Sequence, residues 1–80
     1  MKREEMDAII QEDRQHIGYG APGTPQRMLH GTFTSVRMAQ LGSKGDQSRS
    51  RGDALQAAIA ALHVSHPDFQ PEYDHEYFRD

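Results

Sequence analysis

The residues best suited to chemistry lie in the middle of the chain, in the stretch Gln47-Ser48-Arg49-Ser50-Arg51-Gly52. The alanine-rich segment after this stretch predicts a helix, so these residues would lie at its N-terminus. Free backbone N–H groups and the helix dipole attract phosphate there, and an arginine adds a pair of donors. The alternative is an ordinary capped helix whose arginines pair with the chain's own carboxylates. The candidate anion or nucleic-acid site comprises Arg37, Lys44, Ser48, Arg49, Ser50 and Arg51.

The distribution of charge favours the same region. Residues 27–51 carry five basic side chains and one acidic one. Residues 1–26 carry three basic and five acidic side chains, and residues 52–80 carry one basic and six acidic. A basic middle between acidic flanks indicates where an anion would bind. Mutual neutralisation of these segments within the fold is an equally weighted alternative.

Residues 18–23, GYGAPG, match the dinucleotide-binding pattern G-x-G-x-x-G. That pattern binds pyrophosphate where a buried strand enters the glycine turn and a helix leaves it. Here the glycines come after an amphipathic helix instead of a strand. Pro22 and Pro25 interrupt the residues that follow, where the pattern requires a helix. We therefore interpret residues 18–32 as a Gly/Pro-rich connector and expect no cofactor.

The histidines invite a metal interpretation, since His63 and His66 lie three apart near Asp68, Asp74 and His75. Their spacing matches no familiar zinc pattern, and near a helix C-terminus they suit surface or capping roles instead. We expect no metal.

Catalysis is not expected either. The chain has no cysteine nucleophile, its serines lie outside any G-x-S-x-G turn, and 80 residues rarely enclose a water-excluding cavity. We predict no catalytic residues and no enzyme activity.

The tail, residues 67–80, alternates aromatic and acidic side chains. The favoured interpretation is that its rings pack back on the helices, and the alternatives are insertion into a partner's groove or a flexible end. If the tail binds a partner, removal of residues 67–80 should abolish partner binding and leave the helices intact. The candidate partner-binding residues are Phe69, Tyr73, Asp74, Glu76, Tyr77 and Phe78.

Two helices are predicted to position these groups. Residues 2–17 place Met6, Ile9, Ile10 and Ile17 on one side at helical spacing. Residues 51–65 place Leu55, Ile59 and Leu62 in a similar stripe, among alanines that favour a helix. The second helix comes after a polar loop, residues 42–50, and Ser50 with Asp53 resembles a capping box with a shorter acid.

The element at residues 33–41 is ambiguous. As a strand it alternates Thr34 and Val36 with Phe33 and Arg37, whereas as a helix it has Thr34 as N-cap and a hydrophobic staple from Phe33 to Met38. A lone strand leaves its backbone groups without partners unless another molecule supplies them. We therefore favour a short helix, with a strand as the alternative.

These elements predict a single small, mainly α domain over residues 1–80. A hydrophobic fraction of 35% without tryptophan is low for a self-sufficient core, which favours a homo-oligomer. No run of apolar residues is long enough to cross a membrane, and no secretion signal is apparent, so cytoplasmic residence is expected.

Residues 34–62 are similar in part to the ribbon–helix–helix family of DNA-binding regulators. TSVRM resembles the family's strand, and SRSRGDALQAAIAAL resembles its serine/arginine-rich turn and second helix. The resemblance implies a dimer whose paired strands enter the major groove. It also implies that Ser35 and Arg37 face bases and that Arg49 and the Gly52 backbone contact phosphate. The family has a longer helix between strand and turn than the interval Ala39–Gln47 provides.

The function we predict is that of a small non-enzymatic regulatory or inhibitory protein that docks on a larger host protein or nucleoprotein complex. The short, acidic, cysteine-free chain is similar in general type to small phage-encoded inhibitors, including anti-defence proteins. Its acidic ends would address a basic, nucleic-acid-handling surface by charge complementarity. The alternative is a nucleic-acid- or nucleotide-binding regulator, ribbon–helix–helix-like, that uses Arg37, Lys44, Arg49 and Arg51.

Overall fold

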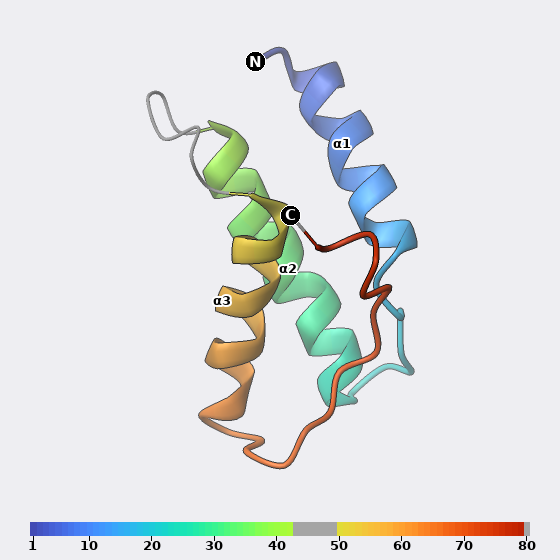
Figure 1. Ribbon diagram of the computed structural model, residues 1–80, viewed down its shortest axis with the longest axis vertical. Helices are drawn as coiled ribbons and strands as arrows, with labels where there is room; N and C mark the ends of the chain where they lie inside the picture. Colours follow the sequence, from blue (N-terminus) through green and yellow to red (C-terminus); the bar gives the residue numbers. More distant parts are fainter. Residues whose placement is uncertain (43–49, 80) are drawn as a thin grey trace.

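The computed structural model describes residues 1–42 and 50–79. It contains three helices, α1 (Arg3–Gln15), α2 (Pro25–Gly42) and α3 (Arg51–His63), and within the described residues no strand. Figure 1 shows α2 and α3 side by side in opposite directions, with α1 on the other side of α2 from α3. The prediction of a small, mainly α domain is confirmed.

Helix α1 forms because its apolar residues recur at helical spacing and its first turn carries Glu4 and Glu5, which suit the positive end of the helix dipole. Ile10 is buried toward the rest of the molecule, as is the charged Asp13. The helix predicted over residues 2–17 is confirmed, with its end two residues earlier.

Helix α2 corrects two expectations at once. Residues 25–32, assigned to the connector, are helical, and the element at 33–41 is the second half of the same long helix. The strand alternative at 33–41 is therefore wrong, and with it the strand that the ribbon–helix–helix resemblance requires. The physical reason is that Pro25 stands at the first helical position, where its missing N–H is not needed. Thr24 precedes it, and its Oγ1 accepts from the Arg27 N–H at 3.4 Å.

Helix α3 begins as predicted. The Ser50 side chain accepts from the Asp53 N–H at 3.1 Å, and the Asp53 carboxylate accepts from the Ser50 N–H at 3.3 Å. This capping box satisfies backbone donors that would otherwise lack partners. The helix ends at His63, shortly before Pro67.

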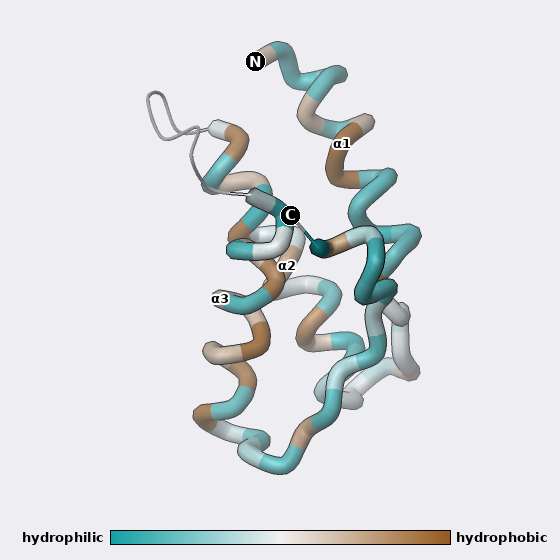
Figure 2. The backbone as a smooth tube through the Cα atoms, viewed as in Figure 1, coloured by the Kyte–Doolittle hydropathy of each residue, from teal (hydrophilic) through white to brown (hydrophobic). Residues whose placement is uncertain are grey.

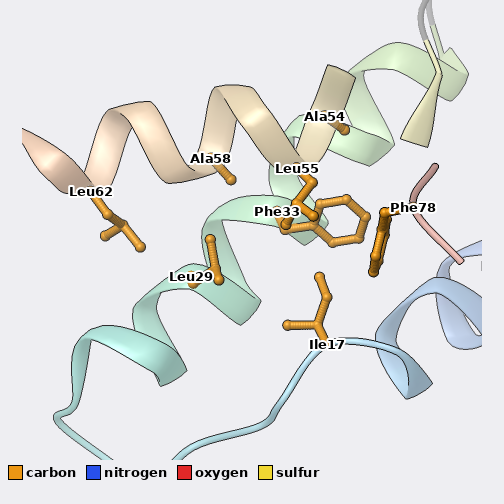
Figure 3. Packing of buried hydrophobic residues seen from close by; sticks show 8 residues of the cluster. All are labelled: Ile17, Leu29, Phe33, Ala54, Leu55, Ala58, Leu62 and Phe78. Atoms are coloured by element: carbon orange, nitrogen blue, oxygen red, sulfur yellow. The ribbon is translucent and has the colours of Figure 1, made fainter. Parts of the chain in front are cut away.

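The core lies between α2, α3 and the two segments that come after α1 and α3. Figure 3 shows Leu29 beside Leu62, and Phe33 between Leu55 and Phe78. The rings of Phe33 and Phe78 meet edge to face, with centroids 5.5 Å apart. The remaining buried members are Ile17, Ala54 and Ala58.

The C-terminal segment, residues 64–79, turns back and runs along the junction of α1 and α2 (Figure 1). Ile17 and Tyr73 form an isolated antiparallel bridge, in which the Asp74 N–H donates to the carbonyl of His16 at 2.8 Å. The packing-back interpretation of the tail is confirmed for residues 67–79. Within the part of the chain described, no helix is both long and apolar enough to cross a membrane.

Candidate functional site

The carboxylate of Asp13 is almost wholly buried, at 1% exposed, and both of its oxygens are hydrogen-bonded. One oxygen accepts from Arg37 Nε of α2 at 2.6 Å, and the other accepts from the Tyr77 hydroxyl at 2.7 Å. Arg37 also donates to the side-chain oxygen of Gln40 at 3.4 Å. A buried carboxylate needs such partners because burial removes its hydration. Asp13 therefore joins α1, α2 and the C-terminal segment.

The Tyr77 hydroxyl is a poor proton donor in the acid–base sense. Burial raises the pKa of Tyr77 to about 12, and the hydrogen bond to Asp13 with its negative charge acts in the same direction. Glu12 adds a smaller effect of the same sign, and Arg51 opposes it. The phenol consequently stays neutral at physiological pH and serves as a hydrogen-bond donor.

The ring of Tyr77 is also held by aromatic and cationic neighbours. His16 stacks on it with centroids 3.7 Å apart and planes 8° from parallel. The Arg51 guanidinium lies 4.2 Å from the ring centroid, and its Nε donates to the Tyr77 carbonyl. The Arg51 guanidinium draws on the negative face of the ring, and His16 adds a stacking contact.

His16 extends this cluster to the surface. Its Nδ1 lies 3.0 Å from a carboxylate oxygen of Asp74, and both side chains are partly exposed. The Tyr77 N–H bonds to the other Asp74 oxygen and lowers the pKa of Asp74, with a further contribution from His16. Asp74 is thus a stable surface carboxylate that also closes the turn at residues 75–78.

His30 forms a second buried polar site between α1 and α2. Its Nε2 accepts from Arg14 Nε at 2.8 Å. Its ring meets the Tyr19 ring edge to face, with centroids 4.6 Å apart. The Nδ1 atom is buried and finds no hydrogen-bond partner among residues 1–42 and 50–79. Burial lowers the pKa of His30, and the charges of Arg14 and Arg27 lower it further. The imidazole is therefore neutral at physiological pH.

Neither cluster is arranged for reaction chemistry. Both Asp13 oxygens are occupied, and the Tyr77 pKa lies far above neutrality. A pocket of about 230 Å³ between α3 and the C-terminal segment is smaller than the roughly 300 Å³ at which ligand pockets begin. Among the described residues no three His, Asp or Glu side chains are grouped so as to hold a metal.

Three of the residues predicted to bind an anion lie in the described part of the chain, and each of them makes contacts within the fold. Arg37 is paired with Asp13, Ser50 caps α3, and Arg51 holds Tyr77. The structure does not bring Arg37 and Arg51 together on an open surface, since each is bonded inside the fold. Lys44, Ser48 and Arg49 lie outside the described residues.

The residues predicted to bind a partner divide into two groups. The four aromatic ones contribute to the core or pack against it: Phe69, Tyr73, Tyr77 and Phe78. Asp74 and Glu76 are exposed, and Glu76 has Arg79 at 3.8 Å. A partner would therefore meet the carboxylates of this segment rather than its rings.

Sequence reasoning missed Asp13, Gln26, His16 and His30. One signal was available for Asp13: it lies three residues after Ile10 and four before Ile17, on the apolar side of its helix. A charged residue in that position predicts a buried partner of opposite charge. For the other three the partners were decided by how the segments pack.

The exposed side chains at the α1–C-terminal junction are predominantly acidic. We call the carboxylates of Glu12, Glu72, Asp74 and Glu76 the acidic face. Further exposed carboxylates on the same two segments are Glu4, Glu5, Asp7 and Asp68. The exposed cations there are Lys2, Arg3 and Arg79. Figure 2 shows a mostly hydrophilic C-terminal segment and an α1 in which hydrophilic residues alternate with hydrophobic ones.

No protein-family model matches the chain, and neither a curated protein nor a solved structure does. The case for its function therefore rests on the chemistry of its own surface.

Proposed function

We propose that this protein is a small non-enzymatic binding protein that docks its acidic face on a basic surface of a larger protein or nucleoprotein partner. By covering that surface it regulates or blocks the partner, in the manner of the small phage-encoded inhibitors to which it is similar in type. The proposed setting is the cytoplasm, and the proposed assembly is a homo-oligomer.

One observation carries the proposal: four arginines, Arg14, Arg27, Arg37 and Arg51, are bonded inside the fold, whereas the carboxylates of the acidic face are exposed. Arg37 and Arg51 hold Asp13 and Tyr77. Arg27 donates to the carbonyls of the connector and lies 3.6 Å from the Tyr19 ring centroid, and Arg14 donates to His30. Few cations are left to compensate the acidic face, so its field is available to steer a basic partner.

The test is affinity capture from a host-cell lysate, with and without nuclease, followed by mass spectrometry. The triple variant Glu12→Gln, Glu72→Gln, Glu76→Gln removes three charges and leaves Asp74 in its turn. We expect the partner to be captured after nuclease treatment, and its affinity for the variant to fall at least about tenfold, because the charge complementarity is lost.

The matched control neutralises three exposed cations instead, Lys2→Gln, Arg3→Gln and Arg79→Gln, and should capture the partner at least as well as the wild type. Capture that survives in the acidic-face variant contradicts the proposal. Capture that disappears with nuclease treatment supports the nucleic-acid alternative in its place.

A further inference from the structure

A pocket of about 230 Å³ lies between the N-terminal part of α3 and the C-terminal segment. Leu55 and Phe78 are almost wholly buried and Tyr73 is partly buried, so these side chains form its inner wall. Three exposed side chains form the rim: Gln56, His75 and Arg79. The pocket therefore has a largely apolar interior and a polar opening.

The volume of the pocket limits its occupant to about one ring. A cofactor or a drug-sized ligand needs roughly 300–1,000 Å³. An apolar cavity of roughly 150 Å³ already binds benzene. The 230 Å³ of this pocket lie between the two, so they suit a single six-membered ring with a short substituent.

Three aromatic side chains contribute to the wall. The rings of Tyr73 and Phe78 meet edge to face with centroids 6.0 Å apart, and the His75 ring lies against that of Tyr73 with centroids 4.2 Å apart. A further ring can meet such side chains edge to face or offset-stacked, which stabilises it beyond the burial of its area. The interior therefore favours an aromatic occupant over an aliphatic one of the same size.

The charge at the pocket is positive. Among the described residues that line it, Arg79 is the one Arg, Lys, Asp or Glu, and no carboxylate of the acidic face takes part. Gly52, also in the lining, lies in the first turn of α3, where the helix dipole favours an anion. Asp53 of the same turn accepts from the Ser50 N–H and does not line the pocket. A cationic occupant would therefore be repelled, and an anionic one attracted.

Arg79 has only a weak partner of its own among the described residues. Its Nη2 lies 3.8 Å from Glu76 Oε1, and the two side chains are 74% and 81% exposed. A long ion pair in water contributes little, so it does not hold the guanidinium away from another anion. A carboxylate placed at the rim by a ring in the pocket can accept from two N–H groups of Arg79 at once.

We propose that this pocket binds a small monocyclic aromatic carboxylate. The ring lies against Leu55, Tyr73 and Phe78, and the carboxylate bonds to Arg79 at the rim. The volume sets the size of the ligand, the aromatic wall selects the ring, and Arg79 with the end of α3 selects the negative charge. Because the acidic face does not line the pocket, this site is independent of docking on a partner.

The test uses phenylacetate as the probe, titrated into the isotope-labelled protein and followed by NMR. We expect saturable shifts of the amides of Gly52, Gln56 and His75, with a Kd of about 1 mM or below. Acetate lacks the ring, phenethyl alcohol lacks the charge, and phenethylamine reverses it. Each of the three should bind at least about tenfold more weakly than phenylacetate, because each loses either the ring contacts or the charged hydrogen bonds.

Arg79→Gln should raise the Kd for phenylacetate at least about tenfold and leave the weaker binding of phenethyl alcohol unchanged. The matched control is Arg3→Gln, which removes an exposed arginine from α1 and should leave both ligands unaffected. The proposal is overturned if these amides show no saturable shift up to about 20 mM phenylacetate. It is also overturned if phenethyl alcohol or phenethylamine binds as tightly as phenylacetate, or if both arginine variants weaken phenylacetate equally.

Discussion

Asp13 of α1 supplies the hydrogen-bond acceptor for a residue of α2 and for a residue of the C-terminal segment. Its carboxylate joins Arg37, 24 residues later, and Tyr77, 64 residues later, while being almost wholly buried. A buried ion pair adds little net stability over an apolar replacement of both partners, but removal of one partner strands the other. The value of Asp13 is therefore that it specifies which segments meet.

Replacement of Asp13 by Ala is expected to lower the free energy of unfolding by about 3–5 kcal/mol, because Arg37 and Tyr77 would lose their acceptor inside the fold. Tyr77→Phe removes one hydrogen bond and should cost about 1–3 kcal/mol. Urea denaturation followed by circular dichroism measures both. The neighbouring exposed Glu12→Ala should change stability by no more than about 0.5 kcal/mol, and a loss as large as that of Asp13→Ala would refute the assignment.

Stability should also fall as the pH drops below about 6.5. His30 has a pKa below its ordinary 6.5 in the folded state, so the unfolded chain takes up the proton first. The unfolded state then binds more protons, and the free energy of unfolding decreases with falling pH. His30→Gln keeps an acceptor for Arg14 and does not titrate, so denaturation curves measured across this range should show a flatter acid limb for the variant.

At alkaline pH the stability should fall because a pKa is raised in the folded state, not lowered. The Tyr77 pKa of about 12 exceeds its ordinary 10.0, so the folded state holds its proton longer than the unfolded state. Stability should therefore be complete below pH 10 and decline as the pH rises toward 12, and Tyr77→Phe should remove this decline.

At the scale of elements, the decisive contact is that of Gln26 at the start of α2. Its Nε2 donates to the carbonyls of Gly18 and Glu72 at 2.8 and 2.9 Å, and its Oε1 accepts from the Glu72 N–H at 2.9 Å. The side chain is 8% exposed. One amide thus joins the connector, α2 and the C-terminal segment, and it satisfies backbone groups that have no sheet to pair them.

Gln26→Glu should destabilise the protein by about 3 kcal/mol or more, since a carboxylate would replace the amide that donates to two carbonyls. Amide hydrogen exchange at Gly18 and Glu72 should quicken in the same variant. Gln56→Glu makes the same chemical change at an exposed site and serves as the control; protection unchanged in Gln26→Glu would show that the contact does not hold the segment.

At the scale of the whole molecule, the C-terminal segment is part of the fold. Phe78 is buried against Phe33, and Tyr77 bonds to Asp13. An 80-residue chain has little core in reserve, so the loss of these rings affects all of it. Removal of the segment would therefore disturb the fold, so docking through the acidic face is tested with point variants instead.

Truncation after His66 should abolish the helical circular dichroism signal or reduce it strongly, because Asp13, Phe33 and Gln26 lose their partners together. The alternative in which the tail serves only a partner predicts the opposite result, intact helices on a shortened chain. A truncated protein that melts cooperatively near the wild-type temperature would contradict this account of the core. A milder variant, Phe78→Ala, should cost about 3–5 kcal/mol and tests the same point without shortening the chain.

Local signals in the sequence determined α1 and the start of α3 at the Ser50–Asp53 box, because helical periodicity and capping act over a few residues. The extent of α2 and the pairing of Asp13 with Arg37 and Tyr77 were decided by tertiary structure. Pro25 is compatible with either a turn or a first helical position, and packing of Leu29 and Phe33 against α3 selects the helix. A hydrogen bond across 64 residues depends on how all the segments pack, and no local pattern encodes it.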